Sequence, residues 1–269
     1  MISPSDIRIA VVGAGNLAWS LIPALQQAGL SVSALISRSL SKADFYCRTW
    51  GIKTGGTDLS LIPPEVNLIF FTVNDQALSE MMPQLAPFSE RQVVCVHTSG
   101  STPLNVWKSL GRFIGVFYPL QTFKAETVQD FSRIPVFLEG DRDVLKILRP
   151  VAELLSQKVQ AMDSENRLRL HLGAVLVNNF TNCLYRLAQE INPSTDFSVY
   201  QPLINGHLEH VFSIGPAQSQ TGPAIRGDIS TLQKHLALLK DQPETAALYR
   251  QFSKIINPTL SLLPPLTSN

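Results

Sequence analysis

Residues 7–28 place a glycine-rich turn between a short apolar run and a helical pattern, and this arrangement constrains the fold more than any other part of the chain. The run 7–12 is typical of a buried strand, and the apolar spacing over 17–28 is that of a helix ending at Gly29. The turn reads Gly13-Ala14-Gly15-Asn16-Leu17-Ala18. This is the alanine variant of the dinucleotide-binding fingerprint, in the strand–turn–helix context that gives the fingerprint meaning.

The small residues of this turn have distinct physical roles. Gly13 permits the tight turn, Gly15 lets backbone N–H groups approach a pyrophosphate, and Ala18 allows close packing of helix on strand. The helix N-terminus adds about half a positive charge. We therefore predict a phosphate-binding site made by Gly13, Ala14, Gly15, Asn16 and Leu17. The alternative is a glycine turn that binds nothing.

The rest of the chain first alternates strands with helices and then becomes helical. Further buried-strand runs occupy 32–36, 67–73, 92–97, 113–117 and 134–138, with helical patterns over 40–50 and over 76–85, the latter capped by Asp75. From residue 164 the predicted helices are 164–191, 199–212, 227–239 and 243–255. This order predicts an α/β protein: a Rossmann doubly wound, mainly parallel sheet over 1–162, followed by an all-α domain over 163–269.

Composition excludes several classes of function. The chain has 22 Lys and Arg residues and 21 Asp and Glu residues, so its net charge is +1. This balance does not provide the excess of positive charge with which proteins bind nucleic acid or an anionic membrane. No apolar run reaches the roughly 18 residues of a membrane span. The three cysteines lack CxxC spacing, which argues for a reducing, cytoplasmic location and against a zinc site. His207 and His210 have no third ligand, so no metal is expected.

The end of the second strand indicates which cofactor is bound. It reads Ser37-Arg38-Ser39, with no acid to accept a hydrogen bond from a ribose 2′-hydroxyl. A guanidinium and two hydroxyls suit a 2′-phosphate, so we predict NADP in preference to NAD. The alternative is that Arg38 is a solvated surface residue.

Several strings together resemble a known superfamily. They are GAGNLA (13–18), ISRS (36–39), FFTVNDQAL (70–78) and VHTSGS (96–101), followed by a long asparagine-bearing helix. This order resembles the 6-phosphogluconate-dehydrogenase-like superfamily, which includes pyrroline-5-carboxylate reductase and deazaflavin-dependent NADP reductases. Within it, HTSGS (97–101), YPLQTF (118–123) and TGPAIRGD (221–228) resemble a family of uncharacterised Rossmann-like proteins with a helical C-terminal domain of unknown function. The resemblance implies two domains and a homodimer built on the helical domain.

One departure limits what the resemblance implies about mechanism. β-Hydroxyacid dehydrogenases of the superfamily carry a lysine three residues before an Asn-Asn pair on the long helix. Here the pair is Asn178-Asn179, but the lysine position holds Val175, which cannot donate a proton. The dehydrogenase mechanism is therefore not carried over.

Polar residues that follow the strands are the candidates for chemistry, because ligands lie beyond the carboxyl ends of parallel strands. Val73 and Asn74 follow one strand and are expected to line the cofactor path, together with Thr98 after the next strand. Ser99 is a candidate to bind substrate or the nicotinamide carboxamide. His97 is either catalytic or a strand-end histidine satisfied by the backbone.

Further candidates lie later in the chain. His171, Asn178 and Asn182 have the spacing of one helix face, so His171 is either a proton donor or part of a polar stripe at a junction. Tyr118 and Gln121 are expected to line the substrate pocket. Arg226 either binds a substrate carboxylate or pairs with Asp228, which can cap the next helix.

Two functional hypotheses follow. The first is an NADP-dependent oxidoreductase that transfers hydride to a small carbonyl or imine. The second is a non-catalytic NADP(H)-binding sensor or interaction module, motivated by the missing lysine. An enzyme that is a pyrroline-5-carboxylate reductase proper ranks below both, since its serine- and glycine-rich C-terminal signature is not visible.

Overall fold

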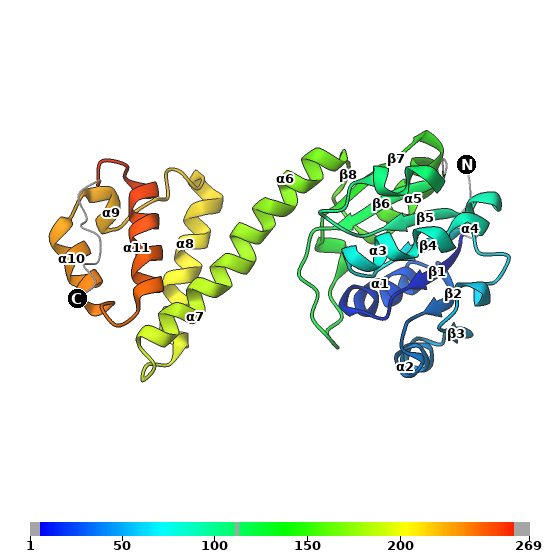
Figure 1. Ribbon diagram of the computed structural model, residues 1–269, viewed down its shortest axis with the longest axis horizontal. Coiled ribbons are helices and arrows are strands. Elements are labelled where there is room, and N and C mark those ends of the chain that lie inside the picture. The colour runs from blue at the N-terminus through cyan, green and yellow to red at the C-terminus, as the bar shows by residue number, and fades with distance from the viewer. Residues whose placement is uncertain (1–5, 111–112, 261–269) are drawn as a thin grey trace. The chain divides into compact units, whose positions relative to one another are not determined.

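The computed structural model describes residues 6–110 and 113–260. The N-terminal part of the described chain holds one eight-stranded sheet in the order β3-β2-β1-β4-β5-β6-β7-β8 (Figure 1). The strands are β1 (Arg8–Val12), β2 (Ser31–Ile36), β3 (Thr54–Gly56), β4 (Leu68–Phe71), β5 (Val94–His97), β6 (Ile114–Pro119), β7 (Val136–Gly140) and β8 (Val159–Ala161). Neighbouring strands are parallel except β6 and β7, which run antiparallel. The predicted α/β class with a mainly parallel sheet is confirmed.

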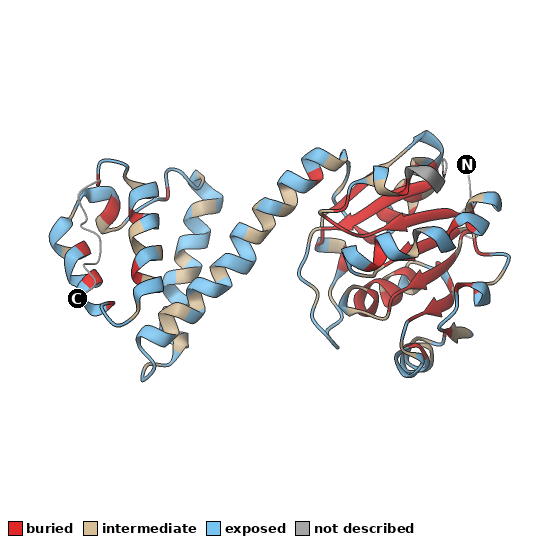
Figure 2. Ribbon diagram, viewed as in Figure 1, coloured by how far each residue is buried: buried red, intermediate tan, exposed pale blue. Residues whose placement is uncertain are grey.

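Both faces of this sheet are buried, which explains why its strands are continuous apolar runs. In β1, Ile9 and Val11 belong to one core, whereas Ala10 and Val12 belong to the other. The first core includes residues of α1 and α5, and the second includes residues of α3 and α4. Figure 2 shows the strands as the most buried part of the molecule.

In the N-terminal part, α1, α2 and α3 lie close to the predicted helices. They are α1 (Asn16–Gln27), α2 (Leu40–Trp50), α3 (Asp75–Met81), α4 (Ala86–Glu90) and α5 (Arg142–Leu155), with 3₁₀ turns η2 (Leu59–Leu61), η3 (Met82–Gln84), η4 (Leu104–Leu110) and η5 (Phe131–Arg133). Gly51 follows α2 with φ +64°, the left-handed conformation that ends many helices. This glycine stop was readable from the sequence.

Several elements have no counterpart among the predicted segments; they include β3, β8, α4, α5 and α9. The two strands are three residues long, too short for a periodic pattern. The α5 segment does carry a signal, since Asp141 caps its first turn and buried residues recur at helical spacing (Val144, Leu148, Val151 and Leu155). Pro150 within α5 obscures that pattern, because proline removes a helical N–H donor.

The chain packs as two compact units, Met1–Asn178 and Asn179–Asn269. The predicted long helix is present as α6 (Ser164–Ala174), a π-helical segment (Val175–Phe180) and α7 (Thr181–Ile191), and the division of the chain between the two units falls within it. The predicted division at residue 162 stays a prediction.

The second unit is helical throughout its described part, which ends at residue 260. After α7 it contains η7 (Phe197–Tyr200), α8 (Gln201–Ile214), α9 (Pro223–Arg226), α10 (Ile229–Leu238) and α11 (Pro243–Ile256). Its buried clusters are small and centre on Leu232 and Leu236 of α10. No helix in the described ranges is long and apolar enough to cross a membrane.

Candidate functional site

The turn between β1 and α1 requires glycine at its first position. Gly13 has φ +115°, and its N–H donates to the Ile36 carbonyl at 2.7 Å. A Cβ atom on Gly13 would lie 2.9 Å from Oγ1 of Thr72 and 3.0 Å from the Thr72 backbone. The Thr72 hydroxyl in turn donates to the Gly13 carbonyl at 2.9 Å. The turn is thus held between β2 and the end of β4, where the strand order reverses beside β1.

The N-terminus of α1 carries the groups that a phosphate needs. Gly15 is the N-cap and supplies no side-chain acceptor, so N–H groups of the first turn keep their capacity to bind an anion. The Tyr46 hydroxyl donates to the Gly15 carbonyl at 3.1 Å and steadies this end. The Asn16 side chain donates to the Phe123 carbonyl at 3.2 Å, so Asn16 offers a phosphate its backbone rather than its amide.

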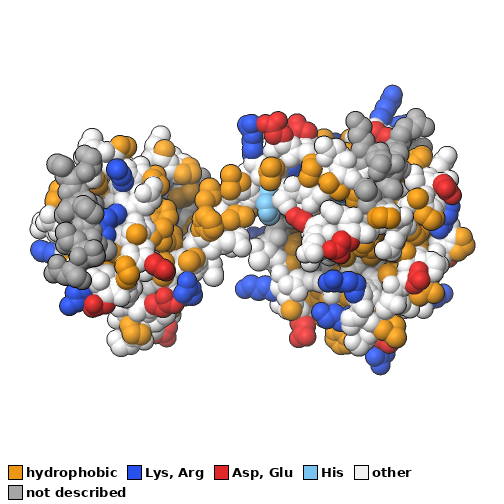
Figure 3. All heavy atoms as spheres, in the orientation of Figure 1, with side chains coloured by type: hydrophobic (Ala, Val, Ile, Leu, Met, Phe, Trp, Pro, Cys, Tyr) orange, Lys and Arg blue, Asp and Glu red, His pale blue; other side chains and the backbone are white. Residues whose placement is uncertain are grey.

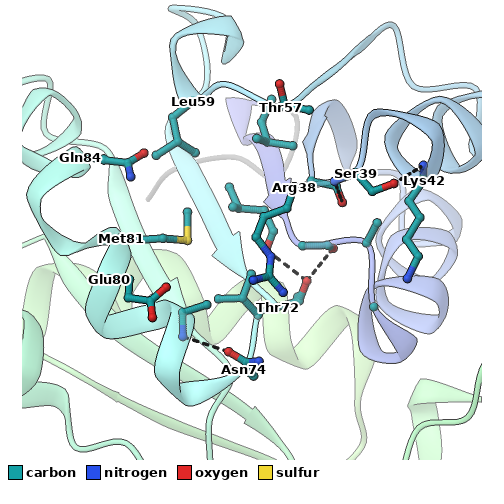
Figure 4. A pocket seen from close by; sticks show the side chains of 18 residues that line it. Arg38, Ser39, Lys42, Thr57, Leu59, Thr72, Asn74, Glu80, Met81 and Gln84 are labelled. Atoms are coloured by element: carbon teal, nitrogen blue, oxygen red, sulfur yellow. Dashed lines mark hydrogen bonds between the residues drawn. The ribbon is translucent and has the colours of Figure 1, made fainter.

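A cavity of about 510 Å³ opens beside this turn (Figure 4). Its lining includes eight of the predicted cofactor-binding residues: Gly13, Ala14, Gly15, Ser37, Arg38, Ser39, Val73 and Asn74. Three others do not line it. Asn16 is exposed, Leu17 packs against the core, and the Thr98 hydroxyl donates to the Phe71 carbonyl at 3.2 Å.

The cavity also contains residues that sequence reasoning missed. Lys42 adds a second cation near Arg38, because Ser39 caps α2 by accepting from the Lys42 N–H at 3.3 Å. In Figure 4, Arg38 extends over the cavity, with Leu59 and Met81 on the wall opposite Lys42. The position of Lys42, three residues after a helix cap, was a signal that the sequence contained. Two cations beside an apolar wall fit a phosphorylated nucleoside with a flat ring.

Asn74 and Asp75 follow β4 in roles that differ from those predicted. Asn74, and not Asp75, caps α3: its Oδ1 accepts from the Ala77 N–H at 2.9 Å. Asp75 is the first helical residue and accepts a hydrogen bond from the Ser101 hydroxyl. Burial would raise the pKa of Asp75, but hydrogen bonds from Ser101, Ser99 and Thr102 outweigh burial and lower it. Asp75 is therefore an anion that holds the loop after β5.

His97, at the end of β5, is completely buried. Its Nδ1 accepts from the Ser99 N–H at 3.3 Å, its Nε2 has no partner, and its ring packs edge-on against Trp107. Burial, reinforced by the charge of Arg167, lowers the pKa of His97 to about 3. The imidazole is neutral at pH 7 and has no proton to release as an imidazolium. The backbone thus satisfies one ring nitrogen of His97 and leaves the other without a hydrogen bond, and a catalytic role for His97 stays a prediction.

Ser99 uses its hydroxyl to shape its own loop. The oxygen accepts from the Ser101 N–H at 3.1 Å and from the Thr102 N–H at 2.9 Å, and the residue is buried. A hydroxyl with these partners is a turn-forming group of the kind common for serine. Direct contact of Ser99 with a substrate stays a prediction.

Tyr118 and His171 meet at the carboxyl end of β6. The Tyr118 hydroxyl lies 3.1 Å from Nδ1 of His171, although the residues are 53 positions apart. Gly100 lies against both: a Cβ atom there would be 2.6 Å from Nδ1 of His171 and 2.8 Å from Cζ of Tyr118. Burial raises the pKa of Tyr118, while the positive charge of Arg167 lowers it. The structure thus brings two predicted residues together with the loop after β5.

Four other predicted site residues show few contacts that bear on their predicted roles. Asn178 donates to the Thr122 hydroxyl, and the Gln121 side chain accepts from the Thr122 N–H at 2.8 Å. Asn182 and Arg226 are exposed in the second unit, and their predicted substrate contacts stay predictions. Because a π-helical segment lies between His171 and Asn182, α-helical spacing does not apply across it.

The remaining sequence expectations concern a helix cap and a metal site. Asp228 caps α10, as one of the two alternatives proposed, accepting from the Thr231 N–H at 3.1 Å. In the described ranges no three His, Cys, Asp or Glu residues gather as metal ligands.

Two family descriptions match the chain. Residues 8–99 match "NADP oxidoreductase coenzyme F420-dependent", and residues 134–256 match a domain of unknown function, DUF2520. No curated protein matches.

Solved structures resemble the whole chain. A Bacteroides fragilis protein described as a "putative NADP oxidoreductase" is 36% identical, with 95% of this chain and 100% of that chain covered and a TM-score of 0.84. A Thermotoga maritima protein is 22% identical over 93% of this chain and 97% of that chain, with a TM-score of 0.68. An imine reductase from Myxococcus stipitatus in complex with NADP+ is 14% identical over 94% and 93%, with a TM-score of 0.66, a likeness of fold.

Proposed function

The chain belongs to the family of the Bacteroides fragilis protein, which joins an NADP-oxidoreductase-type domain to the helical domain of unknown function, and on this premise we propose that it is an NADP-dependent reductase of a small carbonyl or imine. The observation that carries the proposal is the Tyr118–His171 pair at 3.1 Å. The pair lies at the carboxyl edge of the sheet whose first turn is shaped for a dinucleotide. Hydride transfer needs a proton donor at this edge, and the pair supplies one.

The protein's own residues provide binding and proton transfer. When bound beside the turn at Gly13, NADPH would supply the hydride for reduction of the carbonyl or imine carbon. The Tyr118 hydroxyl gives its proton to the substrate oxygen or nitrogen as negative charge develops there. Tyr118 then recovers a proton from Nδ1 of His171, and His171, which is partly exposed, recovers one from solvent. The buried, neutral His97 packs behind this site and exchanges no proton.

Arg38 and Lys42 are proposed to select NADP over NAD. Both line the cavity beside Ser37 and Ser39, and the tip of β2 holds no acid that would repel a 2′-phosphate. Gly13 would hold the pyrophosphate of the same cofactor. Because Gly13 has no Cβ, the turn can pack against Thr72 and a pyrophosphate can approach its backbone.

The enzyme proposal is tested by following NADPH oxidation with a panel of keto acids and cyclic imines. We expect turnover with at least one class, and loss of at least 10²-fold in Tyr118→Phe, because removing a positioned proton donor typically costs that much. Tyr200→Phe, which removes a tyrosine hydroxyl in the 3₁₀ turn η7 of the second unit, is the matched control. Cofactor binding without turnover across the panel would refute the proposal.

A non-catalytic sensor is the second candidate, and Val175 favours it. This residue stands where related dehydrogenases have a lysine, and it begins the π-helical segment. For a sensor, NADPH would raise the melting temperature by mass action without being consumed. A melting shift together with turnover would leave only the enzyme.

We also propose a homodimer through the helical unit, in a reducing, cytoplasmic setting. The second unit exposes large apolar side chains, with Phe212 87% and Leu203 72% exposed, and Figure 3 shows apolar side chains gathered over this unit. A monomer rarely leaves such a surface to water. Analytical ultracentrifugation should give twice the chain mass, and Phe212→Glu should shift it toward the monomer. The three cysteines are all unpaired thiols, as a reducing compartment requires.

A further inference from the structure

Arg167 is the most buried charged residue of the described chain, and no step of the proposed reaction uses it. Its side chain is 1% exposed, and its guanidinium binds the Glu139 carboxylate and donates to the Thr102 carbonyl at 2.6 Å. A buried ion pair costs several kcal/mol of desolvation and often adds no net stability. Because stability alone often does not account for a buried ion pair, we looked to the site beside it for its role.

We propose that Arg167, locked on Glu139, is the positioning residue of this site: it fixes α6 and the loop after β5 around Tyr118. The inference rests on the proposed function, because it assigns a role within the same reaction. It concerns a residue that contacts neither cofactor nor substrate and acts through Tyr118 and His171.

Strand register places the ion pair beside Tyr118. In the antiparallel pair of β6 and β7, Tyr118 is opposite Phe137 and Val116 is opposite Glu139. Opposed residues share a face and so do residues two apart on one strand, so Tyr118 and Glu139 lie on the same face. Helix α6 crosses that face with Arg167 on Glu139 and, one turn later, His171 on Tyr118. Two contacts one helical turn apart therefore fix α6 in register with the strands.

The same guanidinium fixes the loop that backs the pair. Arg167 donates to the Thr102 carbonyl, and the Ser164 hydroxyl both accepts from the Leu104 N–H at 2.9 Å and donates to Glu139 at 2.8 Å. These bonds hold the loop containing Gly100, whose Cα leaves just enough room for His171 and Tyr118. If Arg167 is lost, the strand, loop and helix that form the site lose their common anchor.

Arg167 also acts on Tyr118 through its charge. The elements around Tyr118 carry further charged and titratable groups: Glu165, Arg169 and His171 on α6, Glu139 on β7, Cys95 and His97 on β5, and Asp75 and Glu80 on α3. Glu165 and Arg169 are exposed and pair with each other. Burial raises the pKa of Tyr118 and the Arg167 cation lowers it, so the cation makes the phenol a better acid. In the interior such an interaction is weakly screened.

Three variants separate charge from geometry. Arg167→Met removes the cation and should raise the pKa of Tyr118, whereas Glu139→Gln leaves the cation without its counter-charge and should lower it. The double variant Arg167→Met/Glu139→Leu replaces the pair by apolar groups, a change that buried sites often tolerate. It allows the same measurement if Arg167→Met alone does not fold. Arg169→Met is the control, because Arg169 is exposed and pairs with the exposed Glu165 on the same helix.

The pKa is read by fluorine NMR of fluorotyrosine-labelled full-length protein, with the Tyr118 signal assigned by its loss in Tyr118→Phe. This measurement needs neither cofactor nor substrate, so it tests the role of Arg167 even if the proposed reaction is wrong. We expect opposite shifts in Arg167→Met and Glu139→Gln, none in Arg169→Met, and an upward shift in the double variant. Shifts of one sign, or none, would overturn the inference and leave the proposed function standing.

The rate of NADPH oxidation provides the second readout. In folded Arg167 variants kcat should fall at least tenfold, with the KM for NADPH within about twofold, because the turn at Gly13 is untouched. The pH profile of kcat should move in the direction of the Tyr118 pKa. A proportional loss of NADPH affinity instead would mean that Arg167 only supports the fold, and would overturn the inference.

Discussion

Gly100→Ala offers a sharp test of the Tyr118–His171 pair, because one methyl group enters the point where the two rings meet. The added Cβ would lie 2.6 Å from Nδ1 of His171 and 2.8 Å from Cζ of Tyr118, whereas ordinary contacts begin at 3.4 Å. Gly100 has a φ that any residue can adopt, so the substitution introduces no backbone strain. The rings must withdraw by roughly 0.6–0.8 Å, and a misplacement of about 1 Å can cost 10²-fold in rate.

The expected result is a fall in kcat of between about tenfold and 10²-fold, with NADPH affinity unchanged. The assay is NADPH oxidation with the substrate identified from the keto-acid and imine panel, and calorimetry measures cofactor binding. Gly173→Ala is the matched control: it adds a methyl group to the same helix as His171, with no atom within 4 Å. That variant should keep its rate and gain about 0.5–1 kcal/mol of stability, since alanine favours helices over glycine.

The result would be read together with thermal unfolding. If Gly100→Ala unfolds at the wild-type temperature and still turns over within twofold of wild type, then the rings are not the proton donors and the mechanism fails. A lost rate in both glycine variants would point to general disturbance of α6 rather than to the pair.

Three further predictions follow from the cavity and the buried histidine. Arg38→Gln should weaken NADPH binding about five- to tenfold in calorimetry without changing NADH binding, because an exposed charge-assisted contact is of that size. Arg48→Gln, in the last turn of the neighbouring helix α2, should change neither, and a fall for both coenzymes would refute 2′-phosphate recognition. Gly13→Ala should abolish NADPH binding, and it should lower the free energy of unfolding in urea by about 1–3 kcal/mol because alanine is strained at φ +115°. Retained NADPH binding would contradict the assignment of this turn to phosphate. His97 is protonated near pH 6.5 in the unfolded chain but only near pH 3 in the folded chain. The free energy of unfolding should therefore fall as the pH decreases through that interval, by up to about 1.4 kcal/mol per pH unit. A urea midpoint that does not change over this interval would mean that His97 is not buried in its neutral form.

The phosphate-binding half of the site was largely predictable from the sequence, because its signals are local. The glycines, the strand before them and the helix after them are adjacent in the chain, and Ser37-Arg38-Ser39 follows the next strand. Lys42 belonged to the same local pattern and was overlooked, as one helical turn after the Ser39 cap brings it to the same cavity.

Residue roles at the strand ends were less predictable, because the same residue type can face a ligand or the interior. His97 and Ser99 were reasonable candidates by position, yet the first is buried and neutral and the second holds its own loop. The cap of α3 also moved by one residue, from Asp75 to Asn74, since the Asp75 carboxylate binds the loop after the neighbouring strand. These choices depend on contacts between strands, which periodicity does not encode.

The sequence by itself determined the class of fold, the helical second half and the dinucleotide turn, since hydrophobic period, glycine conformation and helix caps act over a few residues. Only the tertiary structure decided that Tyr118 meets His171 and that Arg167 joins Glu139 to Thr102. Those partners lie 28 to 65 positions apart, and they meet because of strand order, antiparallel register and the placement of α6. Burial and the charge of Arg167 in that arrangement shift the pKa of Tyr118 in opposite directions, and neither effect resides in any single segment of the chain.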